Sequence, residues 1–324
     1  MPTPRAPEDA SVNRLQYIVT RLLQMIPTLL VIMILVFALV RLLPGDPAVA
    51  ILGDRVTPQA IARVHKELGL DKPIPLQFWY FLERVVQGNL GTSVNLKVPV
   101  IQLIADRMPI TLGLTLYAGM LALLMSVPAA VLSALRRGTW IDNLIRAIFQ
   151  VGLSLPVFYL SLQLLTVFGA RLRWFPVGGV GPTLTSDLYY LFLPALSLGF
   201  YLAAILMRNL RSSILEVLDA EYVDFARSKG IRPRLVLLRH ILRNALISTV
   251  TLFGLSIGQL MGGAVITETV FAIPGVGRLM VTSIFGRDYA VVQGLTLAFA
   301  IVIMVVFLLT DLVYSVLDPR TKVA

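Results

Sequence analysis

Six long apolar runs divide the chain, and they restrict its possible folds more than any other feature. A helix rises about 1.5 Å per residue, so each run is long enough to cross a hydrocarbon layer about 30 Å thick. The runs are continuously apolar instead of alternating, which predicts helices and not a membrane β-barrel. We therefore expect an all-α polytopic membrane protein with six transmembrane helices, at residues 17–40, 110–134, 144–168, 188–207, 245–267 and 289–315.

The composition agrees with a membrane protein. Hydrophobic residues make up 57% of the chain and charged residues only 14%, with a mean hydropathy of +0.81. The net charge of +10 fits cytoplasmic loops, because these loops accumulate Lys and Arg. The sequence has no basic stripe interleaved with stacking aromatic residues, so nucleic-acid binding is not expected. Cysteine is absent and His65 and His240 are the only histidines, so we expect no metal site.

The first apolar run could be a signal peptide or a transmembrane helix. Arg14 and Arg21 precede the run Leu22–Val40, and Ala48-Val49-Ala50 resembles a cleavage site. The run has 19 residues, however, which exceeds the roughly 7–15 of a signal-peptide core. We interpret it as an uncleaved first transmembrane helix.

The arginines of the short loops predict the topology. The loop "LRRGTWIDNLIR" lies between the second and third runs, and the Arg-rich stretch 221–240 lies between the fourth and fifth. Short cytoplasmic loops are enriched in Lys and Arg, so both loops and both termini are expected inside. The predicted parts are a cytoplasmic tail at 1–16, a membrane domain at 17–316 with an extracytoplasmic loop at 41–109 and a cytoplasmic loop at 208–244, and a tail at 317–324.

Two amphipathic helices are predicted in the long outer loop. "TPQAIARVHKELGL" begins with Thr57 as N-cap and Pro58 in the first turn, and it ends near Gly69. "PLQFWYFLERVVQG", at 75–88, has a broad apolar face. The pair either packs on the membrane surface and its own transmembrane helices or forms a docking platform for an external partner, and the two interpretations are compatible.

The sequence lacks the motifs of an ATP-hydrolysing or hydrolytic enzyme. G-x-x-x-x-G-K-[ST], HExxH and GxSxG do not occur, so ATP hydrolysis would require another chain. Proton- and sodium-coupled carriers keep titratable groups at mid-membrane depth, and the middles of these apolar runs are almost free of them. This pattern disfavours ion-coupled secondary transport of small polar solutes, which is the alternative to transport driven by an ATPase chain.

Neutral polar residues mark one side of the third run. Gln150, Ser154 and Ser161 lie at offsets of four and eleven and would share one face of a continuous helix. That face could line a pathway for a polar solute. Gly152, Ser154 and Pro156 also predict a kink at this point.

The fifth run carries a second polar pair and a stripe of small residues. Ser256 and Gln259 are neighbours and are further candidates for the pathway. Gly254, Gly258 and Gly262 repeat every fourth residue, which is typical of close helix packing. The stripe serves packing alone, or it lies where the helix moves against a partner subunit.

The stretch 221–240 combines charges with two aromatic residues. Tyr222, Phe225 and Lys229 lie at i, i+3 and i+7, on one side of a short helix that Gly230 interrupts. Pro233 suits the first turn of a second short helix. We predict a helix, a glycine turn and a second helix, all facing the cytoplasm. This segment either binds anionic lipid through its arginines or binds another protein.

Asp224-Phe225-Ala226 is followed by a glycine four residues beyond Ala226. In these residues the stretch resembles the EAA loop of prokaryotic ABC importer permeases. The surroundings resemble the dipeptide/oligopeptide-type branch, which includes glutathione and nickel permeases. The sequence has Asp-Phe-Ala where the motif begins Glu-Ala-Ala, and Leu242-Arg243 where it ends near Leu-Pro. Between residues 20 and 320 the matching segments are "RLLPGDPA", "GLDKPIPLQ", "GNLGTSV", "RHILRNAL", "TETVFAIPGVGRL" and "DPR".

The resemblance implies a type I ABC importer permease fold in the bacterial inner membrane. Such a subunit forms half of a pore with a homologous second permease, as a heterodimer, and imports peptides or related solutes such as glutathione. Two cytoplasmic ATPase subunits bind ATP and Mg, an extracytoplasmic protein delivers substrate, and the permease itself is non-catalytic and binds no cofactor. The residues implied in ATPase coupling are Glu221, Tyr222, Asp224, Phe225, Ala226, Lys229 and Gly230.

Overall fold

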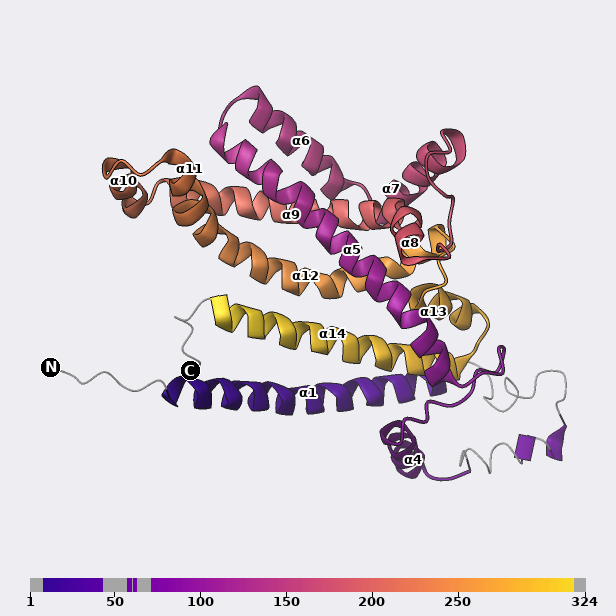
Figure 1. The fold of residues 1–324 in the computed structure, drawn as a ribbon. Helices are drawn as coiled ribbons and strands as arrows, with labels where there is room; N and C mark the ends of the chain where they lie inside the picture. Colours follow the sequence, from indigo (N-terminus) through magenta and orange to yellow (C-terminus); the bar gives the residue numbers. More distant parts are fainter. Residues whose placement is uncertain (1–7, 43–56, 60, 63–70, 318–324) are drawn as a thin grey trace. The chain divides into compact units, whose positions relative to one another are not determined.

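The computed structural model describes residues 8–42, 57–59, 61–62 and 71–317 (Figure 1). Within these residues the regular structure is helical, apart from one antiparallel bridge between Thr92 and Pro99. The long helices are α1 (Glu8–Leu42), α5 (Val100–Leu135), α6 (Trp140–Ser154), α7 (Val157–Leu164) with its π-helical continuation η2 (Leu165–Arg171), α9 (Phe192–Leu218), α12 (Arg243–Val270) and α14 (Tyr289–Leu317). The short elements are α4 (Ile74–Val86), α8 (Leu184–Tyr190), α10 (Glu221–Ser228), α11 (Pro233–Leu235), the π-helical η3 (Val236–Leu242) and α13 (Val276–Phe285).

The predicted all-α membrane fold is confirmed. Five helices in the described part of the chain are long and apolar enough to cross a membrane, or six if the bent pair α6 and α7–η2 counts as one. Several helices extend beyond the apolar runs that predict them. The helix predicted at 188–207 forms as α9, which continues beyond its apolar part through the more polar residues between Met207 and Leu218.

The predicted kink in the third run is confirmed, and it is sharp. The axes of α6 and α7–η2 differ by 106°. Leu155 is extended at φ −87° and ψ 128°, as expected for a residue that precedes proline, and Pro156 precedes the first turn of α7. The prediction that Gln150, Ser154 and Ser161 share one face of a continuous helix is therefore wrong, since the break separates Ser161 from the other two.

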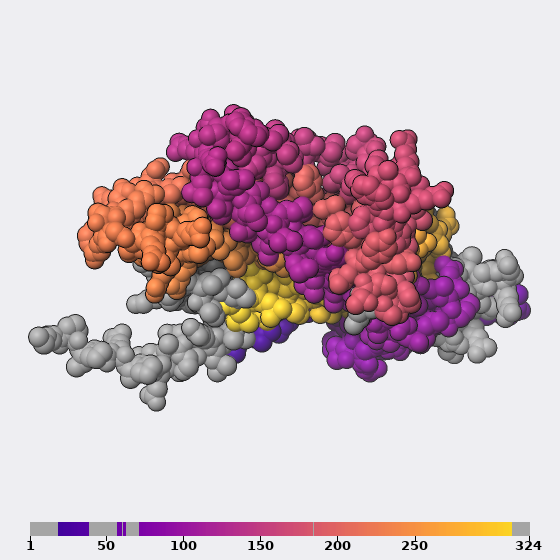
Figure 2. Space-filling model, turned by 45° about the horizontal axis from the view of Figure 1, so that its top comes forward, coloured from indigo at the N-terminus to yellow at the C-terminus, as the bar shows by residue number. Residues whose placement is uncertain are grey.

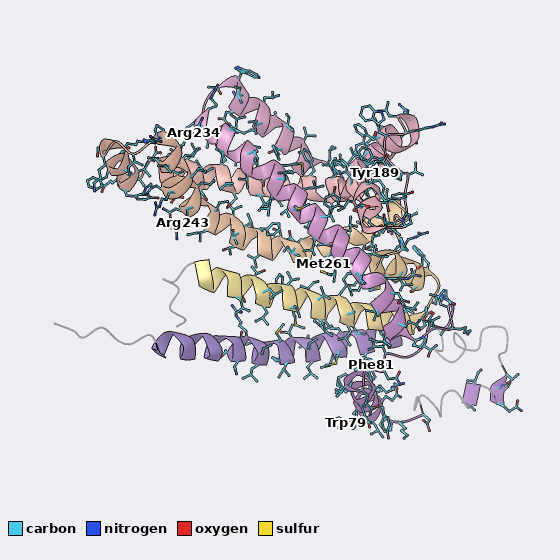
Figure 3. The ribbon with its side chains drawn as sticks, viewed as in Figure 1. Trp79, Phe81, Tyr189, Arg234, Arg243 and Met261 are labelled. Carbon is cyan, nitrogen blue, oxygen red and sulfur yellow. The ribbon has the colours of Figure 1, made fainter. Side chains whose placement is uncertain are left out.

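The chain forms two compact units. The first contains residues 1–106, 280–308 and 320–324, and the second contains 107–279 and 309–319. In the first unit, the helix predicted at 75–88 forms as α4 and packs on α1. The Phe37 ring of α1 lies 5.2 Å from Phe78 and 5.8 Å from Phe81, while Trp79 remains 64% exposed (Figure 3). Most of the helix predicted at 57–70 lies outside the described residues.

The "GNLGTSV" segment of the first unit is held by one buried carboxylate. Asp288 Oδ2 accepts hydrogen bonds from Ser93 Oγ at 2.6 Å and from the backbone N of Asn95 at 3.2 Å. Asn95 Nδ2 donates to the carbonyl of Gly286 at 3.1 Å. These bonds fix the loop before α5 to the turn before α14.

In the second unit, α9 is the central helix. It contacts α6, α7 and α12, and 67% of its most apolar stretch is buried, the highest share among the candidate spans. Glycines allow the close approach. A Cβ on Gly199 would lie 2.5 Å from the Ala118 carbonyl oxygen of α5, and one on Gly152 of α6 would lie 2.7 Å from the Phe200 ring. Small residues of this kind are typical of helix packing in membranes.

The end of α12 is joined to α5 and α13 through a buried glutamate. Glu268 accepts hydrogen bonds from Thr111 Oγ1 at 2.5 Å and from the backbone N of Arg278 at 2.9 Å. Thr111 Oγ1 in turn accepts from the backbone N of Val276 at 3.0 Å. The first turn of a helix leaves N–H groups unpaired, and a carboxylate there satisfies them. "TETVFAIPGVGRL" is therefore a capped corner between two helices.

We predict that Gly199→Ala destabilises the second unit. A methyl group there meets a backbone oxygen that cannot move aside, and overpacking of this kind costs about 1–3 kcal/mol. Gly113→Ala is the matched control, because Gly113 is also helical and a Cβ there has nothing within 4 Å. Both changes bring the same gain in helix propensity, so thermal unfolding in detergent should show a lower midpoint for Gly199→Ala alone. Equal midpoints would contradict the packing described.

Candidate functional site

The predicted EAA stretch forms α10 and the turn that follows it. α10 begins three residues after Leu218, the last residue of α9, and it leads through residues 229–232 to α11 and η3. Acidic Glu221 and Asp224 lie in its first turn and Arg227 in its last, as the helix dipole favours. Figure 2 shows the orange atoms of this segment on the outside of the second unit.

α10 has a buried side and an exposed aromatic side. Val223 is fully buried and Ala226 is 5% exposed, and both belong to the apolar cluster that contains Val236 and Ile241. On the other side, Phe225 is 61% exposed and Tyr222 is 43% exposed. The helix is therefore anchored by small apolar side chains while it presents two aromatic rings outward.

Polar contacts of the two aromatic residues fix their positions. Asn244 Nδ2, in the first turn of α12, donates a hydrogen bond to the Tyr222 hydroxyl oxygen at 2.9 Å. Lys229 Nζ lies 4.4 Å from the centre of the Phe225 ring, a cation–π contact. Asp224 and Arg227 form an exposed ion pair at 3.2 Å, of a kind that contributes little to stability. The exposed side thus carries two rings surrounded by charges of both signs.

The turn after α10 requires glycine. Gly230 has φ +71°, its N–H bonds to the Arg227 carbonyl at 2.9 Å, and the N–H of Ile231 bonds to the Ala226 carbonyl at 3.4 Å. This pair of bonds is the Schellman motif, in which the residue after the helix adopts the left-handed conformation. A side chain there costs roughly 1–2 kcal/mol, which explains the glycine in the sequence pattern.

The predicted helix, glycine turn and helix are confirmed, with one correction. The second helix begins at Pro233 as expected, but it is not a separate short helix, since α11, η3 and α12 continue without a break to Val270. No glycine or proline occurs between Arg234 and Phe253 to end it. In its first two turns and the η3 segment, Ile241 is buried, whereas Leu235 and Leu238 are more than half exposed. Arg234 and Arg243 extend from this part of the unit (Figure 3).

The residues predicted to line a pathway have different environments. Gln150 and Ser154 of α6 and Gln259 of α12 are exposed. Ser161 is buried and donates to Ser197 Oγ of α9 at 2.9 Å, and Ser256 is 5% exposed and donates to the Leu252 carbonyl at 2.7 Å. Three of the five therefore reach the surface of the second unit.

The three glycines of the predicted stripe on α12 also differ. A Cβ on Gly254 would overlap Thr310, whereas one on Gly262 would have nothing within 4 Å. Gly258 lies between them and is half-buried. Within the chain, close contact is therefore made at Gly254, and the stripe opens toward Gly262.

One charged cluster was not anticipated from the sequence. Asp142 lies just before the start of the third apolar run. In the structure it is 1% exposed and forms an ion pair with Arg211 of α9 at 2.8 Å. The sequence signal for this ion pair was an acidic residue beside an apolar run, because an acid that becomes buried needs an opposite charge. Elsewhere in the described residues, no three His, Asp or Glu side chains gather as a metal site would require.

Comparison with known proteins agrees with the motifs. Residues 126–323 match the family model of the binding-protein-dependent transport system inner membrane component, and residues 14–115 match the N-terminal model of such a component. The glutathione transport system permease protein GsiC of Pectobacterium atrosepticum is 43% identical over 95% of this chain and 99% of the relative. A Brucella abortus permease whose name refers to peptide transport is 39% identical, over 94% and 98%.

Solved structures show the same fold. The inward-facing MetNI methionine ABC transporter matches at 18% identity with a TM-score of 0.57, over 67% of this chain and 97% of that one. An amino acid ABC transporter solved with histidines matches at 17% identity with a TM-score of 0.51, over 68% and 94%. Together with the family models, these matches confirm the resemblance. The chain belongs to the family of inner-membrane components of binding-protein-dependent transport systems.

Proposed function

We propose that the chain is a permease subunit of an ATP-driven ABC importer and forms half of the translocation pore for peptides or a related solute such as glutathione. The observation that carries this proposal is the similarity over 95% of the chain to permeases named for glutathione transport. Identity at this level over nearly the whole of both proteins supports a shared task for the complete subunit, beyond a shared fold.

In this proposal α10 is the element that docks on a separate ATPase subunit. Exposed aromatic side chains are common anchors of protein interfaces, and Tyr222 and Phe225 are held outward by the burial of Val223 and Ala226. Asp224 and Lys229 provide charges that orient the partner. Such a contact transmits force without chemistry in this chain, so ATP and Mg would be bound by the partner subunits.

The remaining assignments follow from the same proposal. The arginines near α10 and in the turn between α5 and α6 support the assignment of this end of the second unit to the cytoplasmic side of a bacterial inner membrane. A homologous second permease would complete the pore, with the exposed Gln150, Ser154 and Gln259 as pathway residues and the exposed Gly262 toward the partner. An extracytoplasmic binding protein would deliver substrate, and exposed Trp79 and Arg84 of α4 are candidates for its docking.

One prediction of this proposal concerns the turn at Gly230. Gly230→Val places a β-branched side chain at φ +71°, which that residue type avoids, so α10 should lose its orientation. In proteoliposomes with the second permease, the ATPase subunits and the binding protein, ATP-dependent uptake of glutathione or of dipeptides should be lost, with normal membrane insertion.

Gly88→Val is the control for Gly230→Val, because Gly88 has the similar φ of +75° in the first unit. The Gly88→Val variant should still bind the ATPase subunits. Normal uptake by Gly230→Val would refute coupling through α10. If wild-type uptake continues without the ATPase subunits and collapses with the proton gradient, the protein is an ion-coupled secondary transporter instead.

Another prediction of this proposal separates the two sides of α10. Phe225→Asp changes an exposed ring and should abolish co-purification of the ATPase subunits, while α10 stays as protected from trypsin as in the wild type. Val223→Asp removes burial that contributes about 1.5–3 kcal/mol, so cleavage after Arg227 and Lys229 should accelerate by about 10–100-fold. Phe225→Asp protein that still binds the ATPase subunits would exclude this face as the docking surface.

A further inference from the structure

A buried ion pair joins the helix that leads into α10 to the turn between α5 and α6. Asp142 Oδ1 accepts from Ser133 Oγ at 2.5 Å and from Arg211 Nε at 3.0 Å. Its Oδ2 accepts from the backbone N of Gly138 at 3.1 Å and from Arg211 Nη2 at 2.8 Å. Both carboxylate oxygens are therefore used, by donors from α5, from the turn and from α9.

The guanidinium group fixes the geometry of this contact. Two parallel N–H groups of Arg211 meet the two oxygens of Asp142, and Arg211 Nε also lies 2.9 Å from Ser133 Oγ. Such a two-point contact sets direction as well as distance, which a single apolar contact does not. α9 and the turn between α5 and α6 are thus held in one relative orientation.

Stability alone does not account for a pair in this position. Asp142 is 1% exposed, and the side chain of Arg211 is 18% exposed. Removing both charges from water costs about as much as their attraction returns, and apolar residues of similar volume often replace such pairs without loss. The specific orientation is what the ion pair provides and an apolar replacement lacks.

The pair lies close to α10 along a stiff route. Arg211 is seven residues before Leu218, the end of α9, which corresponds to about 10 Å of helix. Leu210 and Ile214 are fully buried on this part of α9, so it cannot bend freely. A hydrogen-bonded turn connects α9 to α10. The N–H of Ala220 donates to the Val217 carbonyl, and the N–H of Val223 donates to the Ala220 carbonyl. The turn between α5 and α6 and the start of α10 lie toward the same end of α9 (Figure 1).

We propose that Arg211 and Asp142 are positioning residues that make the α5–α6 pair of helices move together with α10. This inference rests on the proposed function of α10 as the ATPase contact. A displacement of α10 moves the end of α9, and the two-point contact passes it to the turn between α5 and α6. Loss of the contact leaves ATPase docking intact and reduces the amount of substrate moved for each ATP hydrolysed.

The test replaces both charges at once, because a single truncation leaves the other charge buried and strongly destabilises the fold. The double variant Asp142→Leu/Arg211→Met keeps the volume of the site without its directional bonds. In the complete reconstituted importer, it should bind the ATPase subunits and unfold at the wild-type temperature. Its ratio of substrate imported to ATP hydrolysed should fall by about tenfold, the effect of a 1.4 kcal/mol change. A wild-type ratio in a folded double variant would overturn the proposal.

Two further variants keep the experiment decisive. Arg211→Lys preserves the charge but not the two-point contact, so it should lower the same ratio even if the double variant does not fold, and a wild-type ratio in Arg211→Lys would overturn the proposal. Ser213→Ala is the control, since it removes a hydrogen bond of 2.9 Å to Ser248 between α9 and α12 and should leave the ratio unchanged. If wild-type complexes show no ATP-dependent uptake, the proposed function fails, independently of the ion pair.

Discussion

Close packing of α9 against its neighbours is the constraint on which the second unit depends. Lipid is as apolar as the side chains that face it, so helices in a membrane associate through packing and interhelical hydrogen bonds. Gly199 and Gly152 permit that packing, because each lies where a Cβ would meet α5 or α9. α9 also carries Arg211 and leads directly into α10. The helix that organises the core is therefore the one to which the candidate docking element is attached.

Charged groups complete this packing at the ends of the helices. Glu268 joins α12 to α5 and α13 at one end, and Asp142 joins α9 to α5 and α6 at the other. No buried side-chain nitrogen or oxygen in the described residues lacks a hydrogen bond. Burying a charge is costly unless it is paired, so each of these acids is held by several donors. The middle of the unit is held by contact between apolar and small side chains, and its ends are held by directional bonds.

The sequence predicted what local chemistry determines. Apolar runs located the helices, Pro156 located the kink, and Gly230 located the turn after α10, because each depends on a few neighbouring residues. The pairing of Asp142 with Arg211 spans 69 positions and depends on how α6 packs on α9, so no local pattern contains it. The position of Ser161 was mispredicted for a related reason, since proline predicts a bend but not one of 106°. The exposed and buried sides of α10 likewise depend on the packing of η3.

The two connections of α10 differ in backbone conformation, and one of them leads to the ion pair. On one side, α10 is joined to α9, an α-helix with buried side chains up to Ile214. On the other side, it passes through the Gly230 turn into η3, whose π-helical backbone interrupts the regular α-helical pattern before α12. π-Helical turns of this kind often occur at functional sites. The buried side of α10 also packs on Val236 and Ile241 of η3, so a displacement of α10 reaches both neighbouring elements. α9 carries its part of that displacement to Arg211, where the helix meets α5 and α6.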